Sequence, residues 1–94
     1  MNFEWDEEKA ESNYKKHGVR FTEAASTFDD PRGFEMLDLY NSAEEERWIR
    51  LGVSFRMRLL VLVYCERHLS RKIRIISARA ANQIEKTIYE KGHL

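Results

Sequence analysis

The 94-residue sequence contains few of the residues that break or cross-link a small protein. It has one proline, four glycines and one cysteine, Cys65. A single cysteine excludes an internal disulfide and a cysteine-rich zinc site, and it fits a reducing compartment such as the cytoplasm. With 43% hydrophobic and 34% charged residues, the composition is neither disordered nor fibrous. The length suits one domain, which we assign to residues 1–94.

Long hydrophobic runs are also missing. The longest, from Leu59 to Cys65, is about a third of the ~20 residues that a membrane-spanning helix needs. The N-terminus is rich in Glu and Lys and has no apolar signal core. We therefore expect a protein that is neither exported nor bound to a membrane.

The net charge is zero at pH 7, but the charges are unevenly distributed. Residues 1–46 hold 5 Lys and Arg against 13 Asp and Glu, whereas residues 47–94 hold 11 against 3. The basic residues between positions 47 and 79 are nearly all arginine, whose planar guanidinium suits bidentate phosphate contacts. This asymmetry favours a polyanion or a complementary protein surface as partner. The alternative is that the acidic half packs near the basic half and neutralises it.

Hydrophobic spacing predicts helices first and strands afterwards, divided by a turn at residues 29–33. A first helix begins at an Asp6 N-cap and ends at Gly18, and a shorter helix follows with Thr22 as its cap. Residues 2–5 form a candidate edge strand before these helices. Beyond the turn, alternation predicts strands over residues 34–39, 47–53, 58–66 and 73–77.

The last predicted element is a helix that begins at Ser77 or Ala78 and ends at Gly92. The connections between the strands are short, which favours antiparallel neighbours. We therefore predict an α+β domain in which two N-terminal helices and one C-terminal helix pack on an antiparallel sheet of about four strands.

The sequence contains no glycine-rich phosphate loop and no serine nucleophile motif. His17, His68 and His93 are far apart and lack the spacing of metal ligands, so we expect neither a metal nor another cofactor. Cys65 lies in the most apolar predicted strand, which indicates a buried, unreactive thiol.

The polar residues of the C-terminal half suit RNA cleavage without a metal. In that reaction the 2′-hydroxyl attacks the adjacent phosphate, and the protein orients the phosphate, stabilises the added negative charge and moves two protons. Arginines stabilise the charge, but they stay protonated and transfer protons poorly. The candidate surface consists of Arg47, Arg67, Arg74, Arg79 and Glu66, with Tyr64 as a further candidate.

Several short sequence motifs, taken together, resemble those of the BrnT toxin family. They run in order through nearly the whole chain: Phe3-Glu4-Trp5-Asp6, Lys16-His17-Gly18-Val19, Glu45-Glu46-Arg47-Trp48-Ile49, Leu60-Val61-Leu62-Val63-Tyr64 with Glu66-Arg67, and Ile73-Arg74-Ile75-Ile76-Ser77-Ala78-Arg79. The resemblance implies a RelE-like fold and a bacterial type II toxin that cleaves RNA and inhibits translation and growth. It also implies a BrnA-like ribbon-helix-helix antitoxin, with operator DNA bound only through the complex.

For each candidate residue, both a functional role and a structural role fit the sequence. Arg47, Arg67, Arg74 and Arg79 are candidate catalytic phosphate contacts, although Arg47 can instead pair with residues 44–46. Glu66 and His17 are candidates for proton transfer, but Glu66 can also hold Arg67 in place and His17 can cap a helix. The candidate RNA-binding residues are Lys16, Arg50, Lys72 and Ser77, of which Ser77 also suits a helix cap.

Two other functions fit the same sequence. One is a non-catalytic module whose basic half binds nucleic acid or an acidic partner, and the other is a structural subunit of a DNA-binding complex. RNA cleavage by the purified protein separates the enzyme from both. An adjacent reading frame for a ribbon-helix-helix protein is expected for the toxin alone.

Overall fold

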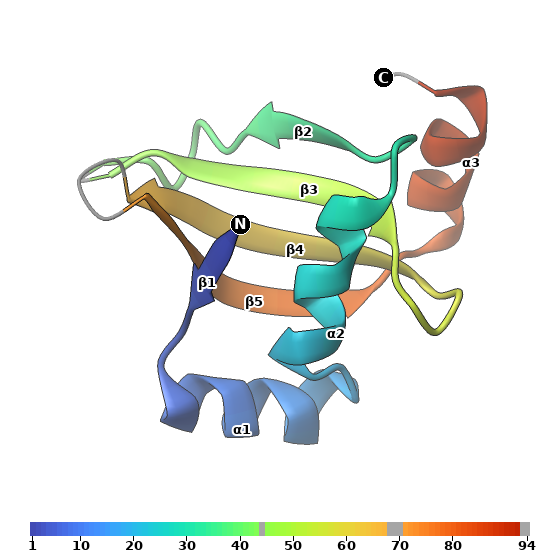
Figure 1. Ribbon diagram of the computed structural model, residues 1–94. Helices are drawn as coiled ribbons and strands as arrows, with labels where there is room; N and C mark the ends of the chain where they lie inside the picture. The colour runs from blue at the N-terminus through green and yellow to red at the C-terminus, as the bar shows by residue number, and fades with distance from the viewer. Residues whose placement is uncertain (44, 68–70, 93–94) are drawn as a thin grey trace.

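The computed structural model describes residues 1–43, 45–67 and 71–92, and within these residues the chain forms a five-stranded sheet with three α-helices (Figure 1). The strands are β1 (Asn2–Glu4), β2 (Phe34–Leu37), β3 (Arg47–Val53), β4 (Leu59–Arg67) and β5 (Lys72–Ala80). The helices are α1 (Glu7–His17), α2 (Phe21–Ala25) and α3 (Gln83–Lys91), and a 3-10 turn, η1 (Ser26–Asp29), follows α2. The predicted α+β class and helix layout are confirmed. The predictions for Glu44, His68 and His93 lie outside the described residues.

The strands follow the order β1-β5-β4-β3-β2. Strands β2 to β5 are antiparallel neighbours, as the short connections predict. The edge strand β1 pairs with β5 in parallel and adds a fifth strand, so the sheet is mixed. The most apolar strand, β4, lies at the centre of the sheet, where both of its faces are covered.

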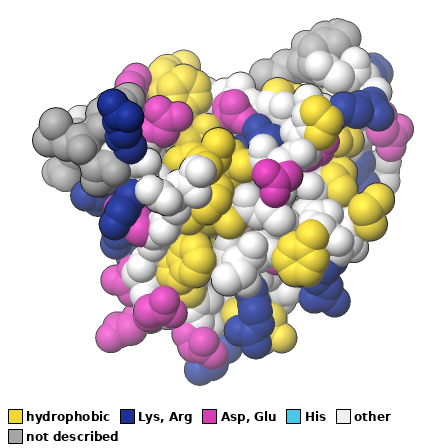
Figure 2. Space-filling model, viewed as in Figure 1, with side chains coloured by type: hydrophobic (Ala, Val, Ile, Leu, Met, Phe, Trp, Pro, Cys, Tyr) yellow, Lys and Arg dark blue, Asp and Glu magenta, His cyan; other side chains and the backbone are white. Residues whose placement is uncertain are grey.

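Helices α1 and α2 pack on one face of the sheet, and this face carries the larger core. Its fully buried members include Phe21 from α2, Leu60 and Leu62 from β4, and Ile75 from β5. Buried Asn13 ties α1 to β5, because its amide donates to the carbonyls of Val19 and Ala78 and accepts the Ala78 N–H. Figure 2 shows this side of the molecule, where dark blue and magenta side chains are dispersed around a yellow hydrophobic strip.

Helix α3 packs on the other face and covers one end of it. Leu51 and Val61 form a small core there with Ala81, and Ile88 and Tyr89 of α3 pack against it. Figure 1 shows α3 at the end of the sheet near the β3–β4 hairpin, so the opposite end of this face lies beyond the helix.

The ends of the helices test the capping predictions. The Asp6 carboxylate accepts the N–H groups of Glu8 and Lys9 at 2.9 and 3.1 Å, which confirms the N-cap of α1. Gly18 ends α1 in the left-handed region at φ 70°, as predicted. The prediction for Thr22 is wrong, because α2 begins at Phe21 with Arg20 in the cap position.

The predicted start of the last helix is also wrong. Strand β5 continues to Ala80, where Ala78 and Ala80 pair with Leu62 and Leu60, so Ser77 lies inside a strand and caps no helix. Cross-strand pairing overrides the helix propensity of these alanines. Helix α3 instead begins after Asn82.

No helix among the described residues is long and apolar enough to cross a membrane.

Candidate functional site

Four arginines of the C-terminal half lie on the face of the sheet that carries α3: Arg47, Arg67, Arg74 and Arg79. Residues paired across antiparallel strands point to the same side. Arg47 of β3 pairs with Cys65 of β4, which in turn pairs with Arg74 of β5. On the same face, Arg67 of β4 pairs with Lys72 of β5, Val63 pairs with Ser77, and Val61 pairs with Arg79. We call the whole set the basic face; it consists of Arg47, Arg67, Lys72, Arg74, Ser77 and Arg79.

A register shift in the sheet is what completes the basic face. Strict alternation along β5 would place Arg74 and Ser77 on opposite sides, because they are three residues apart. The register of β4 with β5 shifts between Val63 and Tyr64, so that Val63 pairs with Ser77 and Tyr64 pairs with Ile75. The irregularity turns Ser77 and Arg79 to the side of Arg74.

Beside α3 the same face forms a groove of about 590 Å³. One part of its lining is apolar and consists of Met36, Ile49, Val61, Val63, Ile84 and Ile88. The other part is polar and consists mainly of His17, Ser77, Arg79, Asn82 and Glu85. The groove therefore brings the last residue of α1 together with β5 and the first turn of α3, and it offers an apolar surface beside a polar one.

Arg79 is the best-oriented cation of the groove. Its two terminal nitrogens donate to the two carboxylate oxygens of Glu85, each at 2.8 Å. The carboxylate also accepts the backbone N–H of Asn82 at 2.9 Å, as part of the capping box of α3. The hydrogen bonds from Arg79 lower the pKa of Glu85, and those same bonds raise the pKa of Arg79. Glu85 is therefore an anion at neutral pH, and it holds Arg79 in place.

The other arginines of the basic face differ in their partners. Arg74 donates to Glu4 of β1 at 2.7 Å, so the acidic half neutralises part of this face, as the alternative reading of the charges expects. The guanidinium of Arg47 has no hydrogen-bond or ion-pair partner among the described residues. Arg67 and Lys72 are exposed.

Two predicted site residues do not reach the basic face. Arg50 is 5% exposed and belongs to the face under α2, where it pairs with Glu35 and donates to the carbonyls of Thr27 and Asp30. Burial lowers its pKa. Glu66 pairs with Ile73, whose side chain lies in the α1 and α2 core, so Glu66 points away from the arginines. We remove both residues from the candidate site.

Tyr64 and Cys65 are buried, and neither lines the groove. Burial raises the pKa of Tyr64 to about 12, and its ring packs edge-on against Phe28 in the larger core. Burial raises the pKa of the Cys65 thiol to about 11, which supports the interpretation of an unreactive side chain. Lys16 is exposed on the last turn of α1 and does not line the groove.

Glu85 is the candidate residue that sequence analysis missed. Its only signal in the sequence is the spacing Asn82-x-x-Glu85, which predicts a capping box. Among the described residues, no three His, Cys, Asp or Glu side chains form a group suited to a metal ion.

The fold has a relative among solved structures. The crystal structure of the Brucella abortus ribonuclease toxin BrnT matches with a TM-score of 0.64 and 22% sequence identity. The match covers 88% of this chain and 99% of that chain. At this level of identity the likeness establishes a shared fold. A comparison with curated proteins finds no match.

A family model gives the stronger result. The model is described as the ribonuclease toxin BrnT of type II toxin-antitoxin systems, and it matches residues 5–85. That range contains α1, β2 to β5 and every polar residue named above as lining the groove. The chain therefore belongs to the BrnT family of ribonuclease toxins, the family that the short sequence motifs resemble.

Proposed function

We propose that this protein is an endoribonuclease that cleaves RNA in the groove beside α3 without a metal ion, and that it thereby inhibits translation and growth. The observation that supports this most directly is the register of the sheet, which places the six side chains of the basic face on one side. A surface with several cations beside a groove suits a single RNA strand, because each nucleotide carries a negatively charged phosphate that a cation can contact.

The scissile phosphate is proposed to bind at the polar end of the groove. Arg79 supplies two N–H donors in a fixed plane, which match two phosphate oxygens and stabilise the extra charge that develops on the phosphate. Ser77 and His17 line the same part of the groove and are further donors. Arg74, Arg67 and Lys72 continue the cationic surface along β4 and β5 and hold the flanking phosphates.

Proton transfer requires groups other than arginine. Glu85 and His17 are the candidates, because both line the groove together with Arg79. When a phosphate takes the place of Glu85 on Arg79, the freed carboxylate becomes the acceptor for the 2′-hydroxyl proton. His17 donates the proton that the leaving 5′-oxygen needs. Glu85 thus takes the role that sequence analysis gave to Glu66.

The antitoxin is proposed to be a BrnA-like ribbon-helix-helix protein that neutralises the toxin in the cytoplasm, with operator DNA bound only by the complex. The cationic basic face predicts acidic side chains on the antitoxin segment that covers it. One domain, residues 1–94, is proposed to carry all of these contacts.

The test is RNA cleavage by purified protein with a chelator present. We expect the wild type to cut RNA in EDTA and the Arg79→Ala variant to be about 100- to 1000-fold slower, as when an enzyme loses one donor to a developing anion. Arg56→Ala is the matched control, because Arg56 is an exposed arginine outside the basic face. Binding without cleavage by the wild type would instead support the non-catalytic module.

A further inference from the structure

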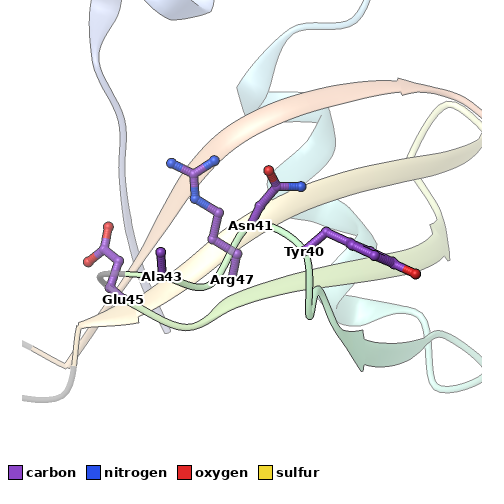
Figure 3. A pocket seen from close by; sticks show the side chains of 5 residues that line it. All are labelled: Tyr40, Asn41, Ala43, Glu45 and Arg47. Carbon is purple, nitrogen blue, oxygen red and sulfur yellow. The ribbon is translucent and has the colours of Figure 1, made fainter.

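We propose that the hollow beside the β2–β3 loop is a second RNA subsite, in which Arg47 binds a phosphate and Tyr40 stacks on a base of the same strand. The inference rests on the proposed function and extends it from the cleaved bond to the flanking nucleotides. The hollow has a volume of about 610 Å³ and is lined by Tyr40, Asn41, Ala43, Glu45 and Arg47 (Figure 3). That volume lies within the usual range of ligand-binding pockets.

Hydrogen bonds join the β2–β3 loop to Arg47, the first residue of β3. The Asp38 N–H donates to the Arg47 carbonyl at 2.8 Å, and the Arg47 N–H donates to the Ser42 hydroxyl at 3.0 Å. That hydroxyl donates to the Asp38 carbonyl at 2.5 Å, and the Asn41 amide donates to the Asp38 carboxylate at 3.1 Å. The backbone that carries Tyr40 is thus bound to the backbone that carries Arg47, so both side chains belong to one local structure.

Tyr40 contributes nothing to the core. It is 98% exposed, more than any other large hydrophobic side chain among the described residues. Aromatic rings normally bury a large area, so a fully exposed ring on a fastened loop is available for a ligand. A base stacks on such a ring regardless of its identity, which is how many proteins hold single-stranded RNA.

Arg47 supplies the cation. It belongs to the basic face and, unlike Arg74 and Arg79, has no acidic partner among the described residues. In Figure 3 the side chains of Arg47 and Glu45 extend from the loop in a similar direction, while the ring of Tyr40 extends away from both at the other end of the hollow. The phosphate and the base therefore bind at separate ends of the subsite.

The hollow and the groove share no lining residue, but Arg47 of the hollow and Arg79 of the groove both belong to the basic face. Arg47 and Arg79 lie on strands either side of β4 and are offset along it, which places their Cα atoms roughly 16 Å apart. One phosphate cannot be shared over that separation, so a strand bound at Arg79 reaches Arg47 through its flanking nucleotides. The exposed ring favours RNA over an acidic peptide, because a peptide of Glu and Asp has no base to stack on it.

Binding of single-stranded oligodeoxynucleotides tests the subsite directly, since they lack the 2′-hydroxyl and cannot be cut by the proposed chemistry. We expect Tyr40→Ala to weaken binding of a fluorescent ten-nucleotide strand roughly 10-fold and Tyr40→Phe to retain it. Arg47→Ala should reduce the slope of log affinity against log salt by about 0.7, because one phosphate contact is lost. Tyr40→Ala should leave that slope unchanged.

Matched controls come from the β3–β4 hairpin. Phe55→Ala removes an aromatic ring that is 68% exposed, and Arg56→Ala removes an exposed arginine. Neither should change oligonucleotide affinity or its salt dependence. The proposal is overturned if Tyr40→Ala binds the strand as the wild type does. It is also overturned if a deca-glutamate peptide binds at Tyr40 and Arg47 in preference to the strand, which would mark the hollow as a site for an acidic protein.

Cleavage assays provide a second measurement of the subsite, and they distinguish a failure of this proposal from a failure of the proposed function. With a long RNA, Tyr40→Ala should raise KM and leave kcat unchanged, because the contact is made equally in the ground and transition states. With an RNA too short to reach the hollow, KM should not change. If the wild type binds but does not cut, the nuclease proposal fails while the oligodeoxynucleotide result still decides the subsite.

Discussion

Arg79 and Glu85 meet in two parallel hydrogen bonds of 2.8 Å across the turn from β5 to α3. The pair orients the guanidinium before RNA arrives, which reduces the entropy that binding has to overcome. It also occupies the donors that a phosphate needs. In the proposed mechanism the carboxylate is bound to Arg79 in the free protein, as the structure shows, and is released when a phosphate replaces it.

Replacing Glu85 with Gln tests the role of this carboxylate. The Glu85→Gln variant keeps the capping box, since Gln also suits this position. It removes the proton acceptor, so we expect kcat for RNA cleavage to fall about 100-fold or more. The KM should stay constant or fall, because Arg79 is then free for phosphate. Glu90→Gln, an exposed change on the same helix, is the control, and an unchanged kcat in Glu85→Gln would exclude the proposed acceptor.

The pH dependence of cleavage gives an independent measure of the same pair. Glu85 must be deprotonated to accept a proton, so the rate falls as the pH drops through its pKa. Hydrogen bonds from Arg79 hold that pKa below its ordinary value of 4.5, which places the acidic limb of kcat/KM below pH 4.5. In Arg79→Lys the paired hydrogen bonds are lost, and the acidic limb should move to higher pH. Identical acidic limbs in the two proteins would contradict the assignment.

Much of the fold was predictable from local patterns. The alternation of Ile49, Leu51 and Val53 matches β3, and the apolar run of β4 indicates a central strand covered on both faces. Capping chemistry at Asp6 and Gly18 sets the ends of α1. These features depend on residues that are close together in the chain, so their pattern is visible in the sequence itself.

The composition of the site was less predictable, because it depends on pairing between distant strands. Strict alternation would place Arg74 on the opposite side of the sheet from Ser77 and Arg79. The register shift between Val63 and Tyr64 places all three on the same side. Arg50 and Glu66 were assigned to the site by charge, although strand pairing turns both toward the other face. The sequence alone does not show whether a charged side chain in a strand faces solvent or a buried partner.

Arg50 should therefore matter for stability. It pairs with Glu35, donates to two backbone carbonyls and lies 4.8 Å from the ring centre of Phe28. The Arg50→Ala variant breaks the ion pair with Glu35 and removes the hydrogen bonds from the guanidinium, although the two carbonyls still accept the N–H groups of Asp30 and Gly33. Because an ion pair with a buried arginine is lost, we expect the free energy of unfolding to fall by about 3 kcal/mol. Urea denaturation measures this loss. At temperatures where the variant is folded, its affinity for single-stranded oligonucleotides should equal that of the wild type; a marked loss would return Arg50 to the RNA site.

The Gly33 position offers a second test of the same contacts. A Cβ atom there would lie 2.3 Å from a terminal nitrogen of Arg50, and the backbone carbonyl of Leu51 is 3.1 Å away. The long arginine side chain has little freedom to move aside, because it is buried and held by its acceptors. We expect Gly33→Ala to lower the midpoint of urea denaturation, and to do so much less in an Arg50→Ala background, where the clash is absent. Equal effects in both backgrounds would place the strain elsewhere.

Asn13 joins α1 to strand β5 by buried hydrogen bonds. It is 7% exposed, and its amide serves three backbone groups: the carbonyls of Val19 and Ala78 and the N–H of Ala78. These bonds fix the end of α1, which carries His17, beside the part of β5 that carries Ser77 and Arg79. Asn13→Ala leaves three buried groups without a partner, so we expect a loss of about 2 kcal/mol or more in urea denaturation. Because the helix end is also released, kcat should fall in the fraction that stays folded, whereas the exposed change Ser12→Ala should alter neither quantity. A destabilised Asn13→Ala with wild-type kcat would show that the groove does not need His17 in this place.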